Sequence, residues 1–323
     1  MATTPYSLVI PVYKNEESIP SLLEAIEKLN RDLDGQLEAV FVVDGSPDQS
    51  YALLKTHLPA CQFQSKLLLL SRNFGSYAAI RAGLQAATGS YFAVMAADLQ
   101  EPPVLVLEFF KTLTREDIDV TFGIRKSRQD PLRQKVPAKL YWYLYKKFVQ
   151  KDMPEGGIDI FGCNLAFRNQ LLQLNELNSS LIGLALWLGF KRKLISYERL
   201  ERQHGKSAWS LRKKIKYAMD SSFAFSDLPI RFLYFIGLTG ILLSALFALI
   251  VIITKLSGAI PIPGYTTTII VIVFFAALNA MGLGIIGSYV WRAFENTKIR
   301  PHSIVMSSLH FQQIQQGIPA NDH

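Results

Sequence analysis

The residues best placed for metal chemistry stand in the stretch VMAADLQEPP, at positions 94–103. Asp98 and Gln100 follow an apolar run there, and their carboxylate and amide oxygens suit a hard cation such as Mg²⁺ or Mn²⁺. Corners of this kind usually carry a second carboxylate, but the residue two positions before Asp98 is Ala96. We therefore expect a divalent metal site at Asp98 and Gln100 with one acid fewer than usual.

Two further polar residues, Asp44 and Arg72, stand at the ends of other apolar runs. The runs are YSLVIPVY, LEAVFVVD, KLLLLS, YFAVMAAD and DVTFGIR. Because amphipathic stretches such as SIPSLLEAIEKLNRDL separate them, they predict a doubly wound α/β fold with a mostly parallel sheet. Ligands of such sheets bind beyond the carboxyl ends of the strands, where Asp44, Arg72 and Asp98 would meet. A simple turn remains an alternative for Asp44, since DGSPD is also turn chemistry.

The composition of the 323-residue chain is apolar and basic. Half of its residues are hydrophobic, and 34 Lys and Arg against 26 Asp and Glu leave a net charge of +8. This balance suits an anionic partner such as a nucleotide, a nucleic acid or a membrane surface. Cys61 and Cys163 follow no disulfide pattern and are expected to be free thiols. The N-terminal residues do not have the pattern of a signal peptide.

Two runs without any charged residue occupy the last third of the chain. They are Phe232–Thr254 and Thr266–Trp291, and each is longer than the ~20 residues that cross a bilayer. Arg231 precedes the first run, Arg292 follows the second, and the segment between them holds only Lys255. By the positive-inside rule, both outer ends lie in the cytoplasm. We therefore expect a two-helix transmembrane hairpin that tethers a cytoplasmic α/β domain.

Two basic amphipathic segments, 131–149 and 210–226, are expected to be helices. In the second, apolar residues recur every four positions beside Arg212, Lys213 and Lys216. A basic amphipathic helix suits an anionic membrane surface. Because 210–226 runs directly into the first apolar run, we expect it to lie at the membrane interface. For 131–149, an ordinary core-facing helix with a solvated basic side remains an alternative.

Five motifs occur in the order and spacing of the family 2 glycosyltransferases with the GT-A fold: IPVYKNEESI, VVDGSPD, LSRNFG, AADLQEPP and RQHGKSAW. The chain resembles the polyprenyl-phosphate glycosyltransferases, the group of dolichol-phosphate-mannose synthase and of bacterial enzymes that glycosylate undecaprenyl phosphate. The resemblance covers nearly the whole chain. It implies a multi-pass enzyme of the inner or plasma membrane that moves a hexose, glucose above others, from a UDP-sugar to a polyprenyl phosphate with inversion. It implies no nucleic-acid partner.

The resemblance also implies a nucleotide-sugar pocket. The residues expected in it are Pro11, Tyr13, Glu16, Asp44, Ser46, Arg72, Ala97, Asp98 and Arg125. The family usually has a further acid just before Asp44, but Val43 stands there.

A second set of residues is expected at the acceptor. Asp159 matches the family's aspartate that faces the acceptor, where it would orient the acceptor or take a residual proton; a plain loop aspartate is the alternative. Arg202 matches a phosphate-binding arginine and is expected to take part in catalysis. Arg128 and Lys206 are expected to bind the acceptor phosphate beside Arg202.

These features divide the chain into four parts. They are a GT-A domain (1–209), an interfacial helix (210–229), a transmembrane hairpin (230–292) and a cytoplasmic tail (293–323). Small residues recur every four positions in the second apolar run, at Ala276, Ala280, Gly284 and Ser288. Such a stripe lets helices approach closely in lipid, either in a homo-oligomer, which we expect, or within one chain.

Three other functions remain open at this point. One is a GDP-mannose-dependent transferase, and another is a processive polysaccharide synthase, although the chain lacks the Gln-x-x-Arg-Trp motif of those enzymes. The third is a nucleotide-sugar-binding membrane protein with impaired catalysis, which Val43 and Ala96 favour. The presence of Asp98 and Asp159 argues against that third reading.

Overall fold

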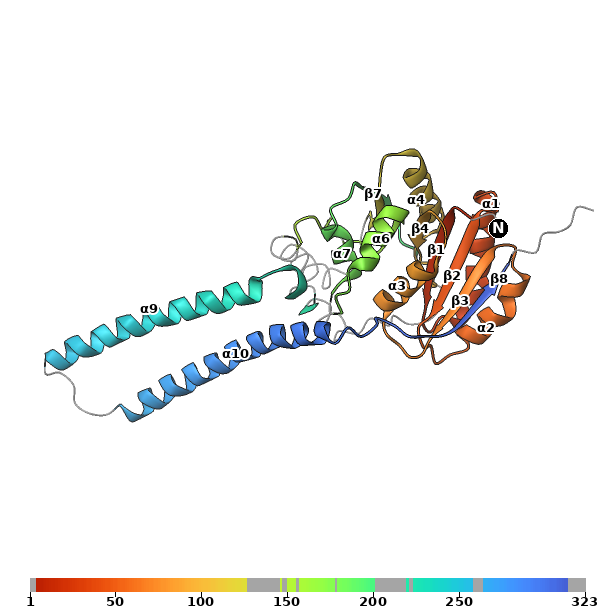
Figure 1. Cartoon of the computed structure of the whole chain (residues 1–323). Helices are drawn as coiled ribbons and strands as arrows, with labels where there is room; N and C mark the ends of the chain where they lie inside the picture. The colour runs from red at the N-terminus through yellow and green to blue at the C-terminus, as the bar shows by residue number, and fades with distance from the viewer. Residues whose placement is uncertain are drawn as a thin grey trace, which may run out of the picture.

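The computed structural model describes residues 4–126, 146, 150–154, 157–177, 179–200, 219–220, 223–257 and 264–312. They form an eight-stranded, mostly parallel sheet with helices on both faces, from which two long helices project (Figure 1). The predicted α/β fold is therefore confirmed. The segments predicted as interfacial helices, 131–149 and 210–226, lie largely outside the described residues.

The strand order of the sheet is β7-β5-β6-β4-β1-β2-β3-β8. Neighbours are parallel except where β6 pairs with β4 and β5, and where β8 pairs with β3. The strands are β1 (Tyr6–Val12), β2 (Leu37–Val43), β3 (Gln64–Leu70), β4 (Tyr91–Val94), β5 (Val120–Arg125), β6 (Ile160–Asn164), β7 (Arg192–Tyr197) and β8 (Val305–Phe311).

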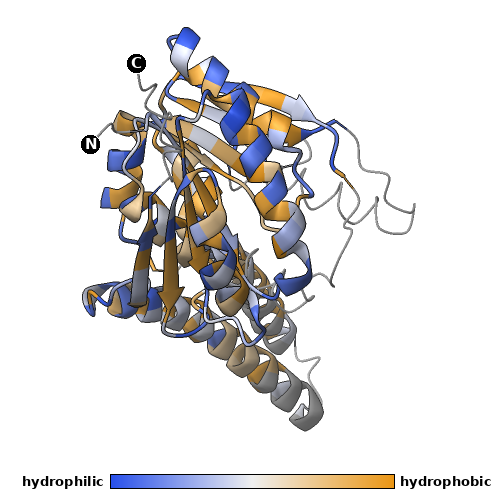
Figure 2. Ribbon diagram, turned by 90° about the vertical axis from the view of Figure 1, so that its right-hand side faces the viewer, coloured by the Kyte–Doolittle hydropathy of each residue, from blue (hydrophilic) through white to orange (hydrophobic). Residues whose placement is uncertain are grey.

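The sheet is packed on both faces, so it has two apolar cores. Side chains alternate between the faces with the two-residue period of a strand: in β1, Leu8 and Ile10 lie in one core and Val9 in the other. Figure 2 shows this apolar interior in orange between helices with blue outer surfaces. One core is closed by α1 (Ile19–Asp32), α2 (Ser50–His57) and α4 (Pro103–Arg115), the other by α3 (Ser76–Ala86), α6 (Leu165–Gln173) and α7 (Leu181–Trp187). Two 3₁₀ turns, η1 (Glu16–Ser18) and η2 (Leu58–Ala60), precede α1 and follow α2.

The segment assigned from sequence to a C-terminal tail, 293–323, contains a strand of the sheet. Within it, β8 pairs antiparallel with β3 along the sheet edge (Figure 1). Its side chains alternate between exposed and partly buried, and Leu309 and Phe311 pack against a core. The chain therefore returns from its two long helices to the sheet, so the domain assigned to 1–209 is completed by residues after 300.

Both charge-free runs are helical. They form α9 (Leu228–Leu256) and α10 (Tyr265–Thr297), which extend together away from the sheet (Figure 1). Among the described residues, one helical stretch, Phe274–Thr297, has the length and apolar composition needed to cross a membrane. Large side chains such as Phe235 and Leu283 face away from the protein on both helices. The span expected at Phe232–Thr254 stays a prediction.

Several contacts fix the helix pair to the sheet domain. Arg292 of α10 forms an ion pair of 2.7 Å with Asp220 and lies 4.9 Å over the Phe223 ring. The ring of Phe225 fills the space beside Gly183 of α7, where a Cβ would come within 2.3 Å of it. These contacts join the residues just before α9 to both α10 and α7, so the two helices leave the domain from a packed junction.

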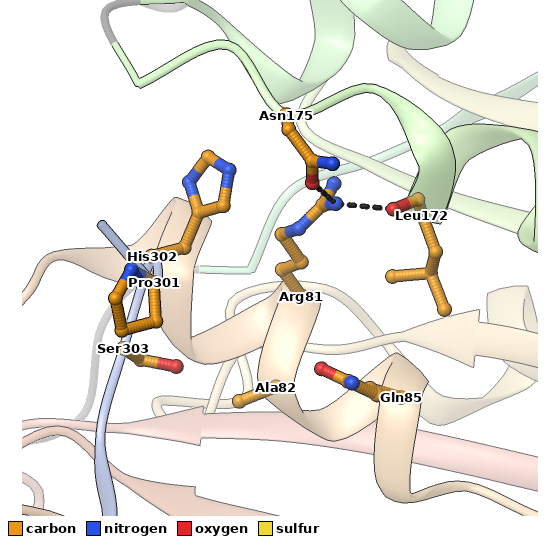
Figure 3. Close-up of a pocket in the computed structure, with 8 residues that line it drawn as sticks. All are labelled: Arg81, Ala82, Gln85, Leu172, Asn175, Pro301, His302 and Ser303. Atoms are coloured by element: carbon orange, nitrogen blue, oxygen red, sulfur yellow. Dashed lines mark hydrogen bonds between the residues drawn. The ribbon is translucent and has the colours of Figure 1, made fainter. Parts of the chain in front are cut away.

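The connection from α10 to β8 packs on α3 beside a cavity of about 270 Å³ (Figure 3). Arg81 of α3 is buried there, and its guanidinium donates to the carbonyl oxygen of Leu171 at 3.1 Å and to Oδ1 of Asn175 at 2.7 Å. Leu171 lies in the last turn of α6, where free carbonyls favour a cation. Pro301 and His302 close the other side of the cavity. Arg81 thus joins α3 to the end of α6.

A buried ion pair joins β2 and β3 at the edge of the sheet opposite the polar strand ends. Lys66 and Glu38 are 2.8 Å apart, with side chains 8% and 0% exposed. Ser7 donates to Glu38 at 2.6 Å, and Thr88 donates through both its hydroxyl and its backbone N–H at 2.8 Å. Burial raises the pKa of Glu38, but the bonds from Lys66, Ser7 and Thr88 outweigh it and the pKa is lowered. The carboxylate is therefore satisfied only as part of this network.

Lys66→Met removes the cation and leaves Glu38 with hydroxyl and backbone donors alone. We expect the free energy of unfolding at pH 7 to fall by about 3–5 kcal/mol, because a buried charge loses its partner. Loss of the Lys66 bond removes one cause that lowers the Glu38 pKa, so we expect this pKa to rise relative to the parent's. The stability difference between variant and parent should therefore shrink as the pH falls. Thermal unfolding at pH 7 and pH 5 measures both effects, with the exposed Lys55→Met as control. Equal midpoints for the two variants would contradict the prediction.

Candidate active site

The loops that follow β1 and β2 are joined by hydrogen bonds at the end of the sheet where the parallel strands have their C-terminal ends, and we call this pair of loops the wall. The backbone N–H of Lys14 donates to Oγ of Ser46 at 2.8 Å, and Ser46 donates to Asp48 at 2.6 Å. Asp48 also accepts from the backbone N–H of Glu16 at 3.1 Å, while the Glu16 carboxylate accepts from Gln49 at 2.8 Å. Burial raises the Asp48 pKa, but the hydrogen bonds from Ser46, Ser50 and the Glu16 backbone outweigh burial, so the pKa is lowered. The wall is built around Asp48, which was not predicted.

Asp44 holds the next loop. Its side chain is 2% exposed, and its two oxygens accept from the backbone N–H groups of Phe74 and Gly75 at 2.7 and 2.8 Å. Gly45, at φ +54°, lets the two loops cross, because a Cβ there would lie 2.3 Å from the carbonyl carbon of Arg72. Asp44 therefore ties the end of β2 to the start of α3, which is more than the turn considered from sequence. Its contact with a nucleotide stays a prediction.

The remaining residues expected at the nucleotide lie around this wall. Pro11 pairs with Val42 inside the sheet, and Tyr13 is partly buried just after β1. Arg72 is exposed, with its guanidinium 4.4 Å over the Phe74 ring. Ala97 is 2% exposed behind β4. These positions are compatible with a pocket at the strand ends, and the role of each residue stays a prediction.

The corner after β4 is a tight turn. The backbone N–H of Gln100 donates to Oδ1 of Asp98 at 3.3 Å, and Leu99 between them has φ +54°, a left-handed conformation that is strained for this residue type. The side-chain oxygen of Gln100 accepts from Arg199, and its backbone oxygen accepts from Leu200 at 3.0 Å. The segment after β7 thus holds the corner at Asp98 and Gln100 in place.

The oxygens of Asp98 and Gln100 fit a hard cation chemically, although the amide oxygen is hydrogen-bonded to Arg199. In the described part of the chain, no group of three or more His, Cys, Asp and Glu side chains surrounds a common metal position. A cation at this corner would have few protein ligands, and Asp98 would supply the carboxylate among them.

Asp159 is brought to the same edge by β6. It directly precedes this antiparallel strand, which begins where β4 and β5 end. Arg125 donates to both carboxylate oxygens of Asp159, and the Tyr197 hydroxyl donates to one of them at 2.6 Å. Burial lowers the Arg125 pKa, but the carboxylate raises it above its usual value. Burial and then the Asp159 charge raise the pKa of Tyr197.

Glu101 is an acid in this corner to which the sequence analysis assigned no role. It is 3% exposed, and its Oε2 has no hydrogen-bond partner. Burial, followed by the charges of Asp98 and Asp159, raises its pKa to about 7, against the opposing effect of Arg199 and Arg125. Glu101 directly follows Gln100, so the motif itself could have indicated it.

Tyr197 and Arg199 were also missed, and no motif marks them. They reach the site because β7 pairs with β5, a contact between segments 72 residues apart. Three residues predicted at the acceptor phosphate, Arg128, Arg202 and Lys206, lie outside the described residues.

The chain is similar to known proteins over most of its length. The family model described as glycosyl transferase family 2 matches residues 7–174. CsbB of Bacillus subtilis (strain 168), whose name assigns it provisionally to the glycosyltransferases, is 32% identical over 93% of this chain and 90% of that protein. The undecaprenyl-phosphate 4-deoxy-4-formamido-L-arabinose transferase of Pseudomonas savastanoi pv. phaseolicola (strain 1448A / Race 6) is 28% identical over 93% of this chain and 89% of that protein.

Glu101→Gln tests the buried acid through stability. Because its pKa is raised, Glu101 binds a proton more tightly in the folded chain than in the unfolded chain. This proton binding stabilises the fold fully below the pKa that Glu101 has in the unfolded chain, and the stabilisation is lost as the pH rises through about 7. The amide stays neutral, so we expect the variant to lose less stability than the parent between pH 5 and pH 8. At about 1.4 kcal/mol per pKa unit, the difference is on the order of 3 kcal/mol. Thermal midpoints at both pH values measure it.

The exposed Glu108→Gln on α4 is the matched control for this experiment. A parent-like pH dependence in Glu101→Gln would mean that Glu101 does not hold a proton in the folded chain.

Proposed function

The chain belongs to glycosyl transferase family 2 and is a glycosyltransferase, and from this premise we propose that it moves a hexose from a UDP-sugar to a polyprenyl phosphate. The transfer is a single inverting displacement. The main support for this acceptor is similarity over nearly the whole chain to a transferase whose name specifies undecaprenyl phosphate. Glucose is the proposed sugar, although that relative is named for a modified arabinose, so sugar specificity is the least constrained part of the proposal.

The observation that carries the proposal is the meeting of acids and arginines at one sheet edge. Arg125 donates to Asp159 and Arg199 donates to Gln100. The charges of Asp98, Asp159 and both arginines all act on the buried Glu101 between them. Donor pyrophosphate and acceptor phosphate repel each other, so a site that joins them needs fixed positive charge. Arginine suits this task because its planar fork binds two phosphate oxygens at once. Arg128, Arg202 and Lys206 are proposed to add charge on the acceptor side.

We assign the divalent cation to Asp98 and Gln100, with the donor pyrophosphate as its further oxygen source. When bound, Mg²⁺ or Mn²⁺ would neutralise charge on the departing nucleoside diphosphate. The chain's own residues hold and orient the substrates: the wall formed by the loops after β1 and β2 supports the nucleotide, and Asp159 orients the acceptor. A phosphate monoester is already largely dianionic at neutral pH, so it needs little activation as a nucleophile.

The membrane arrangement supports the same substrate. We propose that α9 and α10 both span the bilayer, with the sheet domain, 210–229 and the C-terminal strand on the cytoplasmic side. The acceptor's hydrocarbon tail then stays in lipid while its phosphate reaches the strand ends. A homo-oligomer formed through the small-residue stripe of α10 is also proposed, since Gly284 of that stripe has open space beside it.

Transfer of radiolabelled sugar to extracted lipid tests the function. Full-length protein in membranes is incubated with UDP-glucose, other UDP-sugars or GDP-mannose, and with polyprenyl phosphate. The proposal predicts that label enters the lipid fraction and that mild acid releases this label as a monosaccharide. The nucleotide sugar that gives this result is the donor. Label in polymer would indicate a processive synthase, and binding of donor without any transfer would indicate the impaired protein.

Ala96→Asp tests the metal corner. The parent corner offers the cation one carboxylate, Asp98, so a second carboxylate should strengthen metal binding. We expect the variant to need less Mn²⁺ or Mg²⁺ for half-maximal transfer, and Asp98→Ala to abolish metal-dependent donor binding. Calorimetric titration of UDP with and without metal measures both, with Ala96→Asn as the uncharged control. Unchanged metal dependence in Ala96→Asp would mean that position 96 does not face the ion.

A further inference from the structure

Asp159, Arg125 and Tyr197 form a closed group across three neighbouring strands. Arg125 and Tyr197 are register partners at the ends of β5 and β7, and the backbone N–H of Asp159 donates to the carbonyl of Gly123 at 3.3 Å. Nε and Nη2 of Arg125 each donate to a different carboxylate oxygen, and Tyr197 adds a bond of 2.6 Å. Both oxygens of Asp159 are therefore engaged, and two donors of Arg125 point at them.

In this arrangement the two residues engage each other, which opposes the substrate-binding roles proposed for them. Arg125 cannot present the Nε and Nη2 side of its fork to a phosphate while Asp159 occupies it. The three hydrogen bonds that Asp159 accepts leave its carboxylate little capacity to orient an acceptor. A guanidinium binds carboxylate and phosphate through the same two-point geometry. The Asp159 carboxylate thus sits where a phosphate group would bind Arg125.

The ion pair is open to exchange. The side chains of Arg125 and Asp159 are 17% and 22% exposed, whereas Tyr197 is 5% exposed. At these exposures solvent still reaches the pair, and the desolvation of both charges offsets part of their attraction, so the net free energy of the pair is modest. A phosphate monoester carries about −1.5 to −2 charges at neutral pH, more than a carboxylate, and so can compete for the guanidinium. The buried Tyr197 stays in place when the pair separates.

We propose that Arg125 is a phosphate-binding residue that Asp159 keeps closed until a substrate phosphate displaces it, and that Tyr197 is a positioning residue that holds the released Asp159. The proposal rests on the proposed transfer between phosphate-bearing substrates. Its consequence is that Asp159 gains most of its capacity to orient the acceptor once a phosphate is bound. Because burial and the Asp159 charge raise the pKa of Tyr197, its hydroxyl remains a donor throughout this exchange.

Asp159→Asn removes the competing charge but keeps the shape of the side chain. Calorimetry of the full-length variant in detergent, with UDP, a short-chain polyprenyl phosphate and inorganic phosphate as separate probes, measures phosphate affinity. We expect tightening by roughly three- to tenfold relative to the parent, the factor that accompanies loss of a partly exposed ion pair. Tightening of the polyprenyl phosphate places the acceptor at Arg125, and tightening of UDP alone places the donor there. Turnover should fall by a factor on the order of 10²–10⁴.

A double variant ties the gain to Arg125. Asp159→Asn combined with Arg125→Ala should bind no more tightly than Arg125→Ala alone, and Arg125→Lys should lose most of the affinity because it keeps the charge without the fork. Asp159→Ala repeats the comparison if the amide variant does not fold. Unchanged or weaker binding of all three probes, or a gain that persists without Arg125, overturns the proposal.

Tyr197→Phe separates positioning from simple packing. The ring is kept, so folding and the acceptor KM should stay close to the parent's, while kcat falls on the order of tenfold because Asp159 is no longer oriented. A kcat equal to the parent's, or a parallel loss in kcat and thermal midpoint, would contradict the assigned role.

The binding measurements do not require sugar transfer. They therefore test the exchange even if labelled lipid fails to form, and labelled lipid tests the function even if no exchange occurs.

Discussion

Three acidic side chains lie close together and partly out of solvent at the end of the sheet where the parallel strands end. The surrounding residues offset their negative charge. Glu101, Asp98 and Asp159 interact electrostatically, and the first is buried without a partner for one of its oxygens. Like charges in such surroundings repel strongly, so the site needs cations or protons. Arg125 and Arg199 supply fixed charge, and Glu101 holds a proton more readily than an exposed glutamate does. The described charges at this end of the sheet are thereby kept close to balance, which suits the proposed binding of a cation and phosphates.

The topology of the sheet explains how these groups meet. In a wholly parallel sheet, side chains at one edge all follow strand ends, as Asp44 and Asp98 do. The antiparallel β6 lies between β4 and β5, so the residue that precedes it comes to the same edge. Asp159 enters the site in this way, between Asp98 on one side and Arg125 on the other. The reversal of one strand therefore places a carboxylate beside an arginine that is 34 residues earlier in the chain.

The helix pair is joined to the sheet domain at two points, before the start of α9 and after the end of α10 (Figure 1). The residues before α9 pack on α7 through Phe225 and Gly183, and Arg292 of α10 pairs with Asp220. After α10, the chain crosses α3 and adds β8 to the sheet. A helix pair held at two points cannot rotate freely about a single linker. The strand ends consequently keep a defined orientation toward the helices, as transfer to the proposed lipid acceptor would require.

The sequence by itself determined the α/β class, most strand positions, the helical nature of both apolar runs and the corner at Asp98 and Gln100. These follow from local patterns: continuous apolar runs, a helical period and a short motif at a strand end. Only the tertiary structure decided that β6 is antiparallel, that β8 returns to the sheet, and that Tyr197, Arg199 and Glu101 join the site. Strand order and hydrogen-bond partners depend on contacts between distant segments, which no local period encodes. The same reason applies to Asp159, whose place at the edge the family motif implied but whose engagement by Arg125 appears only when the two strands lie side by side.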